Sequence, residues 1–267
     1  MGIVNVTPDS FSDGGMFSAT NLAIEHAVKL VEEGAAILDI GGESTRPNAA
    51  PVGLQEELDR VIPVIEALVS QVNIPISNDT YKPQVMQAAI AAGASIVNDV
   101  RALQEEGAGL KESALQVVSK SNAGVCLMHM QGMPQTMQDN PQYDNVVNNV
   151  ITFLQERLQA SIDAGIAKNR ILLDPGFGFG KTRAHNIALI QQLESFAALD
   201  QPLLVGLSRK SVLNVLNTSQ MTGNDVDARL YASIAASVIA AMKGAKILRV
   251  HDVKATVEAL KVVAAIQ

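Results

Sequence analysis

The chain has 267 residues, enough for one large core, and 48% of them are hydrophobic although only 3% are aromatic. A core built mainly from Ala, Val, Ile and Leu suits helices packed on a parallel sheet. The formal net charge of −7 argues against nucleic acid or an anionic membrane as a partner, because both attract basic surfaces. The single cysteine, Cys126, excludes an intramolecular disulfide, and no apolar run reaches the ~18 residues needed to cross a bilayer, so we expect a cytoplasmic protein.

A repeating unit runs along the chain: a short apolar run, a polar residue at its end, and then an amphipathic stretch. The apolar runs predict eight strands, at Ile3 to Val6, Ala36 to Ile40, Ile74 to Asn78, Ser95 to Val100, Gly124 to His129, Ile171 to Asp174, Leu203 to Leu207 and Ile247 to Val250. Helices are expected between them, among others at Leu54 to Leu68, Val85 to Ala92, Val146 to Ala164, Leu230 to Met242 and Ala255 to Ala264.

The connections differ at the two ends of these units. Short connections lead from helix to strand, each with a glycine suited to a left-handed residue after the helix: Gly34, Gly93, Gly165 and Gly244. The connections from strand to helix are longer, at 7–18, 41–53, 130–141 and 175–182. Elaboration at the carboxyl ends of eight parallel strands is typical of a (β/α)8 TIM barrel, so we expect one domain over residues 1–267. A doubly wound open sheet, which usually has fewer strands, is the alternative.

Polar residues follow almost every predicted strand, and they form two chemical groups. Asp79, Asn98 and Asp174 are acceptors suited to a planar ring with several N–H donors. The cations and the histidine of the second group can bind phosphate or carboxylate oxygens; they are Arg46, Arg209, Arg249 and His251. Both groups at one barrel end predict a site for a donor-rich ring attached to an anion. For Asp39, Asp99 and Asp252 we favour a simpler role, bracing loop backbone.

Two further segments suggest chemistry of their own. The glycine-rich stretch after Asp174 does not fit the phosphate-binding loop motif, because proline stands at the first glycine position; we expect it to present Phe177 or Phe179. The stretch from Ser208 to Ser211 follows the seventh strand and is predicted to open a helix whose N–H groups attract an anion. A Schiff base on Lys210 is less favoured, because this lysine lies beyond the strand and next to an arginine.

Seven segments in chain order resemble the signatures of dihydropteroate synthases: Gly2 to Gly15, Leu38 to Pro47, Ile96 to Asp99, Met128 to Gly132, Leu173 to Lys181, Gly206 to Ser211 and Arg249 to Asp252. The resemblance covers essentially the whole chain. It implies a transferase of folate biosynthesis and sulfonamide target that joins 6-hydroxymethyl-7,8-dihydropterin pyrophosphate to p-aminobenzoate, releases pyrophosphate and is assisted by Mg²⁺. It also implies a homodimer formed through the last helices.

The same resemblance implies roles for individual residues. The pterin would be held by Asp79, Asn98, Asp174, Lys210 and Arg249, of which Asp79, Lys210 and Arg249 are the expected catalytic residues. The pyrophosphate would bind Asn5, Thr45, Arg249 and His251, with Asn5 as the metal contact. The p-aminobenzoate pocket and its loops would include Phe11, Ser44, Arg46, Pro47, Phe179 and Ser211. The implied mechanism is dissociative: pyrophosphate leaves first, and the amine attacks a cationic pterin methylene.

A pterin-binding barrel that carries folate for a methyltransferase partner is the alternative function. Such a module has no reason to keep Asn5, Thr45, Arg46 and His251 together. A catalytically silent relative would show gaps among the signatures, and the sequence has none. Two departures stand out: the β-hairpin that usually precedes the first strand is expected to be missing, and Asn78 occupies a position usually apolar. We expect an unpaired Asn78 amide facing the helices, and a stabilising effect of Asn78→Val.

Overall fold

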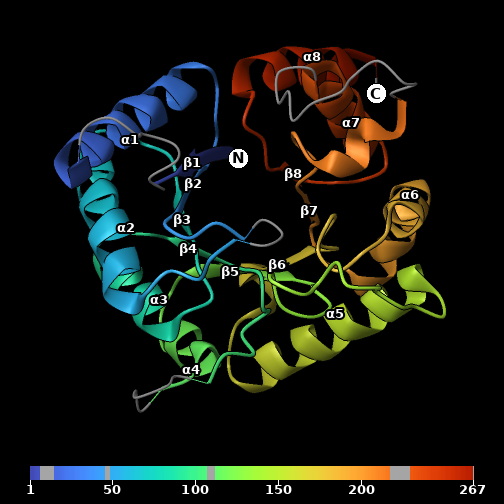
Figure 1. Ribbon diagram of the computed structural model, residues 1–267, viewed down its shortest axis with the longest axis horizontal. Helices are drawn as coiled ribbons and strands as arrows, with labels where there is room; N and C mark the ends of the chain where they lie inside the picture. Colours follow the sequence, from blue (N-terminus) through green and yellow to red (C-terminus); the bar gives the residue numbers. More distant parts are fainter. Residues whose placement is uncertain (7–14, 46–48, 107–111, 217–228, 267) are drawn as a thin grey trace.

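The computed structural model describes residues 1–6, 15–45, 49–106, 112–216 and 229–266. Its strands lie at the centre and its helices around them (Figure 1). The eight strands are β1 (Gly2–Asn5), β2 (Leu38–Gly41), β3 (Ile76–Asp79), β4 (Ile96–Asp99), β5 (Gly124–Met128), β6 (Ile171–Asp174), β7 (Leu204–Val205) and β8 (Ile247–Leu248). Each falls within or overlaps a predicted strand, and the last two are shorter than predicted.

The strands form a closed ring of parallel neighbours. The first six strands make one sheet in the order β1 to β6, and β7 pairs with β8. Single parallel bridges join the two sheets, from Leu173 to Leu203 and from Gly2 to Val250. Two hydrogen bonds support the second junction, because the Ile3 N–H donates to Val250 O at 3.1 Å and the Val250 N–H donates to Met1 O at 2.9 Å. The predicted (β/α)8 barrel is confirmed.

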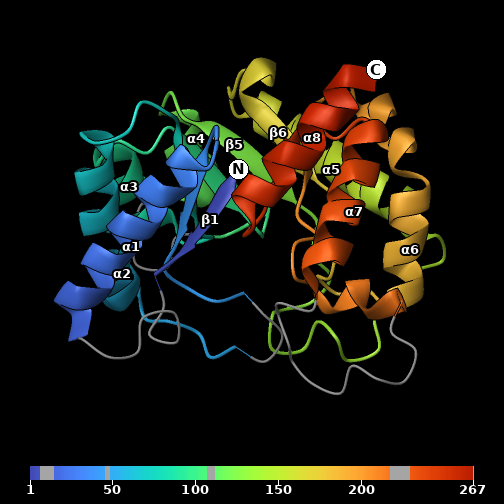
Figure 2. The same cartoon turned by 90° about the horizontal axis from the view of Figure 1, so that it is seen from above.

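Helices lie around the outside of this ring, as Figure 1 shows down the barrel and Figure 2 from a view turned by 90°. They are α1 (Gly15–Glu32), α2 (Leu54–Val69), α3 (Pro83–Ala91), α4 (Ala114–Ser119), α5 (Val146–Asp163), α6 (Arg183–Gln191), α7 (Leu230–Met242) and α8 (Val253–Ile266). Helix α1 begins inside a stretch predicted as loop. The four glycines predicted to end helices all have positive φ, between +93° and +110°, so that prediction is confirmed. None of the described helices is long and apolar enough to cross a membrane.

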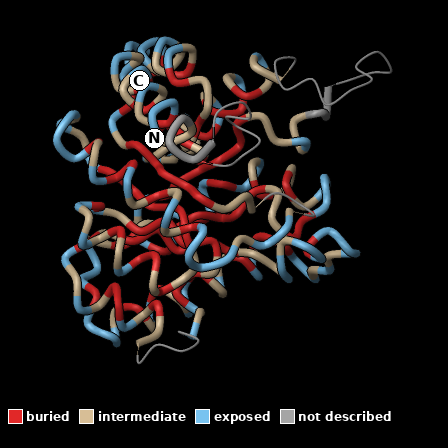
Figure 3. Tube along the Cα trace, turned by 60° about the vertical axis from the view of Figure 1, so that its left-hand side comes forward, coloured by how far each residue is buried: buried red, intermediate tan, exposed pale blue. Residues whose placement is uncertain are grey.

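The core follows the strands and the inner faces of the helices (Figure 3). Its largest fully buried side chains include Leu38, Ile40, Ile65, Leu127 and Leu154. Apolar packing therefore fixes the strands, whose polar carboxyl-terminal residues meet at one end. That end is where the long connections begin.

Asn78 corrects one expectation about this core. Its side chain is fully buried, as predicted for a residue that alternates with the inward Asp79. Its Nδ2 donates to Ile40 O at 3.0 Å, so the amide is not wholly unpaired. Only the Oδ1 atom lacks a partner. The backbone carbonyl of the neighbouring strand supplied an acceptor that the sequence pattern did not reveal.

Candidate active site

An arginine between two carboxylates forms the centre of the barrel mouth. Arg249, which follows β8, donates from Nε to Asp39 Oδ2 and from Nη2 to Asp79 Oδ2, each at 2.6 Å. Asn98 of β4 donates from Nδ2 to the same Asp39 oxygen at 3.0 Å. Four predicted strand-end residues are thus joined in one buried network. We had expected Asp39 to brace loop backbone, and this expectation is wrong. Barrel closure brings its carboxylate against Arg249, which follows the last strand.

Electrostatics make this network unusual. Burial raises the pKa of Asp79 from 3.8 to about 7, although Arg249 acts in the opposite direction. Burial would lower the pKa of Arg249, but Asp39 and Asp79 outweigh it and raise that pKa. The Oδ1 atom of Asp39 is buried without a partner. The site therefore holds a fixed cation surrounded by acceptors with spare hydrogen-bonding capacity.

A second cation, Lys210, lies against the loop that follows β6. Its Nζ donates to Phe177 O at 2.6 Å and lies 4.5 Å from the centroid of the Phe179 ring. Burial lowers its pKa to about 8, opposed by the nearby Asp174 carboxylate. The pKa of Asp174 is itself raised by burial, although Lys210 lowers it. Phe177 is only 1% exposed and belongs to the core, so Phe179 is the aromatic ring that this loop presents.

Two other predicted anion contacts, Arg209 and His251, follow β7 and β8. His251 Nδ1 lies 3.0 Å from Ser208 Oγ, and the His251 N–H donates to the same oxygen at 3.1 Å. Arg209 donates to both oxygens of Asp252, at 3.0 Å from Nε and 2.5 Å from Nη2. Asp252 is thus a brace, as predicted, and the Arg209 guanidinium is held by it. Of the described members of the predicted anion group, Arg249 belongs to the central network.

The other predicted residues differ in position: one braces a loop, several lie at strand ends or in loops, and three lie outside the described residues. Asp99 accepts from the N–H groups of Arg101 and Leu103, both at 2.7 Å, and is the loop brace we expected. Asn5 ends β1 partly buried, and Ser44 and Thr45 lie partly buried after β2. Ser211 is exposed and begins a short 3-10 helix, Ser211–Leu216, not an α-helix. Phe11, Arg46 and Pro47 lie outside the described residues.

Sequence reasoning missed a buried contact between the loops after β5 and β6. Lys181 Nζ lies 2.8 Å from His129 Nδ1 and donates to Gly176 O at 2.9 Å and to Phe179 O at 3.0 Å. Both residues had been noted, His129 as a strand-end residue and Lys181 as part of a signature. Neither carried a pattern that pointed to the other, since they are 52 positions apart.

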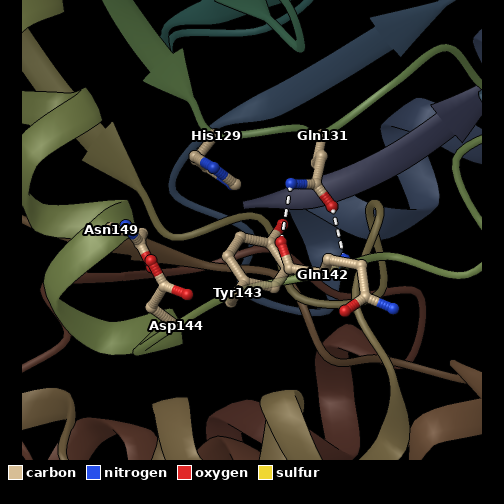
Figure 4. A pocket seen from close by; sticks show the side chains of 6 residues that line it. All are labelled: His129, Gln131, Gln142, Tyr143, Asp144 and Asn149. Carbon is tan, nitrogen blue, oxygen red and sulfur yellow. Dashed lines mark hydrogen bonds between the residues drawn. The ribbon is translucent and has the colours of Figure 1, made fainter.

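His129 also lines a polar pocket of about 280 Å³ (Figure 4). Gln131 closes part of it by pairing with the Gln142 backbone, donating to Gln142 O at 3.0 Å and accepting from the Gln142 N–H at 3.1 Å. The lining also includes Tyr143, Asp144 and Asn149. The rings of His129 and Tyr143 lie 6.0 Å apart, centroid to centroid. The pocket therefore backs onto the same loop contact.

Comparison with known proteins agrees with this geometry. A family model described as "Pterin binding enzyme" matches residues 1–251. The dihydropteroate synthase of Escherichia coli K12 is 50% identical over 265 residues, which cover 99% of this chain and 90% of that protein. The chain belongs to the pterin-binding enzyme family.

Solved structures of family members share both fold and sequence with the chain. Xanthomonas albilineans dihydropteroate synthase with 4-aminobenzoic acid has a TM-score of 0.90 and 51% identity, covering 100% of this chain and 92% of that one. The same enzyme with 7,8-dihydropteroate has a TM-score of 0.87 and 49% identity, with the same coverage. Yersinia pestis dihydropteroate synthase in a sulfonamide drug complex has a TM-score of 0.90 and 49% identity, covering 100% and 93%.

Within this family the chain falls among the dihydropteroate synthases, which are transferases of folate biosynthesis. The predictions of family, fold and enzyme class are confirmed. The alternative of a folate-carrying methyl-transfer module finds no support among these relatives. Membership in this family agrees with the predicted site for a donor-rich ring attached to an anion.

Proposed function

We propose that the chain condenses 6-hydroxymethyl-7,8-dihydropterin pyrophosphate with p-aminobenzoate, giving 7,8-dihydropteroate and pyrophosphate. The observation that carries the proposal is the network at the barrel mouth. Asp79, Asn98 and Asp174 lie there at the ends of different strands, together with the half-buried cations Lys210 and Arg249. Relatives with about half their residues identical have been solved with 4-aminobenzoic acid and with 7,8-dihydropteroate. We further infer that residues 1–267 form one domain.

The acceptors of the network suit the pterin ring. Asp79 and Asp174 offer carboxylate oxygens to ring N–H and amino groups, and Asn98 can both donate and accept. A site of buried acceptors rejects an analogue without matching donors by about 10⁴ or more. Lys210 and Arg249 complete this pocket as cationic donors to ring acceptors. We therefore assign the pterin to Asp79, Asn98, Asp174, Lys210 and Arg249, and expect strict pterin recognition.

The diphosphate is assigned to the edge of the same pocket. Arg249 and His251 could donate to its oxygens. Asn5 ends β1, and Thr45 lies in the connection after β2. Charge that develops on the departing pyrophosphate is stabilised most where donors are already oriented. Arg249 meets this condition, because two carboxylates fix its guanidinium.

Asn5 is a suitable partner for Mg²⁺. Its amide oxygen is a hard donor at a strand end, and Mg²⁺ commonly takes one or two protein ligands together with substrate phosphates. Among the described residues, no cluster of three or more His, Cys, Asp or Glu side chains could form a site made of protein ligands alone. Asn5 would hold such an ion through its amide oxygen, and the substrate phosphates would supply further oxygen ligands. When bound, the ion would neutralise charge on the leaving group.

The amine pocket is assigned to the outer rim of the barrel mouth. Phe179 presents its ring beside Lys210, and Ser211 begins the next turn of chain. Ser44 lies in the connection after β2, and the assignment extends to Phe11, Arg46 and Pro47 outside the described residues. These residues would contact p-aminobenzoate.

The bond changes need no protein nucleophile. The bond between the pterin methylene carbon and the pyrophosphate oxygen breaks first, and its electron pair leaves with pyrophosphate. The nearby carboxylates of Asp79 and Asp174 favour the positive charge left on the pterin. The lone pair of the aromatic amine then forms the new C–N bond, and the amine proton passes to solvent.

The outer faces of the last two helices suit a homodimer, which we also propose. Tyr231 on α7 is 82% exposed, and Val262 on α8 is 62% exposed. The other large apolar side chains exposed on these helices are Ile239, Met242 and Ile266. Apolar groups gathered on neighbouring helices are typical of an association surface. A molar mass from light scattering equal to one chain would reject the dimer.

Pyrophosphate release tests the main proposal. We expect release that requires both substrates together and Mg²⁺, and a product with the mass of 7,8-dihydropteroate. Omitting either substrate should reduce release to background, and a chelator should do the same. Folded protein that forms no condensation product under these conditions would reject the proposal.

A further inference from the structure

The loop between β6 and α6 contacts two ammonium groups, one from the buried Lys181 and one from the half-buried Lys210. On the side of the pterin pocket, Lys210 Nζ donates to Phe177 O at 2.6 Å. Lys181 Nζ donates to the carbonyls on either side of that residue, Gly176 O at 2.9 Å and Phe179 O at 3.0 Å. The two lysines therefore bind different carbonyl groups of the same turn.

The surroundings of Lys181 are those of a clamp. The residue is 3% exposed, and beyond the two turn carbonyls its Nζ reaches His129 Nδ1 at 2.8 Å and His129 O at 3.3 Å. An ammonium has three donors, so these acceptors use its full capacity. Burial lowers the pKa of Lys181 well below its ordinary value, and the nearby Asp174 carboxylate partly opposes this. A side chain that only filled space would need no such donors.

The loop is also pressed closely against the chain that follows β5. Gly176 has a φ of +69°, and a Cβ there would lie 1.8 Å from His129 O. Gly180 has a φ of +60°, and its Cβ would lie 2.2 Å from Gln131 O. Tyr143 Oη donates to Gly180 O at 2.7 Å from the outside. Backbone thus packs directly on backbone, with the Lys181 ammonium at the centre of the contact.

We propose that Lys181 is a positioning residue that fixes the Phe179 ring and the Phe177 carbonyl against Lys210, and so sets the amine site relative to the pterin. The inference rests on the proposed function. Lys181 acts through the loop, because its Nζ is occupied by loop and β5 acceptors. Loss of the clamp would let the Phe179 carbonyl turn away and release its ring from the Lys210 ammonium.

Lys181→Met tests this, because methionine keeps most of the length and removes every donor. Displacements of about 1 Å at a reacting group cost on the order of 10² in rate, so kcat/KM for p-aminobenzoate should fall by about that factor. Most of this fall should come from a higher KM for the amine. The dissociation constant of the pterin substrate, measured by calorimetry without the amine, should change by less than about 10-fold, because most of its contacts come from other strands.

Arg170→Met is the matched control. Its guanidinium donates to Ala123 O at 2.9 Å and to Val118 O at 3.1 Å, away from the site described above. It should lower the melting temperature and leave both substrate constants unchanged. A Lys181→Met protein that loses thermal stability in the same way but keeps the wild-type amine KM would overturn the proposal. If Lys181→Met does not fold, Tyr143→Phe removes one bond of the same contact, and an unchanged amine KM in that variant would equally overturn it.

Hydrogen exchange separates this proposal from the proposed function. Amides of the peptide 175–182 should exchange faster in Lys181→Met than in wild type, without any substrate present. Absence of pyrophosphate release from the wild type would reject the function, and exchange would still judge the clamp. Unchanged exchange across this peptide would reject the clamp even where the wild type is active.

Discussion

Half-buried arginines lie near both ends of the barrel, and their hydrogen-bond partners differ. Near the amino ends of the strands, Arg170 donates only to backbone carbonyls, among them Ala123 O and Val118 O. At the carboxyl ends, Arg249 meets the carboxylates of Asp39 and Asp79. The first arginine completes the hydrogen bonding of loops. The second leaves an acceptor without a partner in its network, the Asp39 Oδ1 atom.

This difference shows how one barrel combines a stable fold with a site that can bind a ligand. Buried polar groups that are fully paired stabilise a fold, and those with spare capacity cost stability unless a ligand pairs them. Near the amino ends, the Arg170 guanidinium is paired with backbone carbonyls of the chain itself. The carboxyl end carries raised carboxyl pKa values at Asp79 and Asp174, because burial there is only partly offset by cations. We therefore expect substitutions at the carboxyl end to act on turnover, and those at the amino end to act on stability.

Arg249→Ala should have the largest effect. It removes the cation that faces the pterin and the leaving group, and loss of one oriented charge-stabilising group typically costs about 10²–10³ in rate. Turnover measured by pyrophosphate release should fall at least that far. Arg170→Ala is the counterpart at the other end and should keep wild-type turnover in the fraction that remains folded. Near-normal activity of Arg249→Ala would break the comparison.

Lys210→Ala should follow, with a loss of about 10² or more in turnover, because it removes the second cation of the pocket. Its matched control is Lys168→Ala, whose ammonium pairs with Asp200 on the surface at 2.7 Å. Exposed pairs of this kind contribute little. Equal activities of the two variants would contradict the role assigned to Lys210.

Asp39→Asn should weaken turnover less, by about 10-fold. The change keeps the shape of the side chain but replaces a charged acceptor of the Arg249 Nε–H and the Asn98 amide by a neutral one. The dissociation constant of the pterin substrate should rise with it. A variant at Asp252, which pairs with Arg209 outside the central network, serves as control. Wild-type pterin affinity in Asp39→Asn would show that Asp39 orients nothing.

The pH dependence of stability should reveal Asp79. Because burial raises its pKa from 3.8 to about 7, the folded chain holds a proton between those values that the unfolded chain releases. The free energy of unfolding should therefore fall as pH rises through that window. Burial lowers the pKa of His129 to about 3, so this residue makes the free energy of unfolding rise with pH. The test therefore compares the pH dependence of the wild type with that of a variant without the Asp79 carboxyl. Urea unfolding of wild type should lose more stability with rising pH than Asp79→Asn, and parallel curves would be contrary to expectation.

Asn78→Val should have the smallest effect, a gain of about 1 kcal/mol in unfolding free energy. It removes a buried acceptor without a partner, and the lost bond to Ile40 O offsets part of the gain. Turnover should not change, because strand alternation turns this side chain away from the pocket. Asn78→Asp, which has acceptors only, should be destabilised. A lower unfolding midpoint for Asn78→Val would show that the bond to Ile40 outweighs the orphaned oxygen.

The sequence by itself determined the barrel and most of its functional end. Strand and helix periodicity, the glycines after the helices and the strand-end polar residues are local signals, so they could be recognised without coordinates. The same signals placed Asp79, Asn98 and Asp174 at one end of the parallel strands. Motif order supplied the family.

Only the tertiary structure decided which of these groups meet. Asp39 pairs with Arg249 across 210 positions, because closure of the ring places the last strand beside the first. The choice between Phe177 as core and Phe179 as the presented ring depended on how the loop turns, as did the position of Lys181 between two loops. A side chain's partner depends on sheet register and loop packing, which arise from contacts distant in sequence and leave no periodic trace in it.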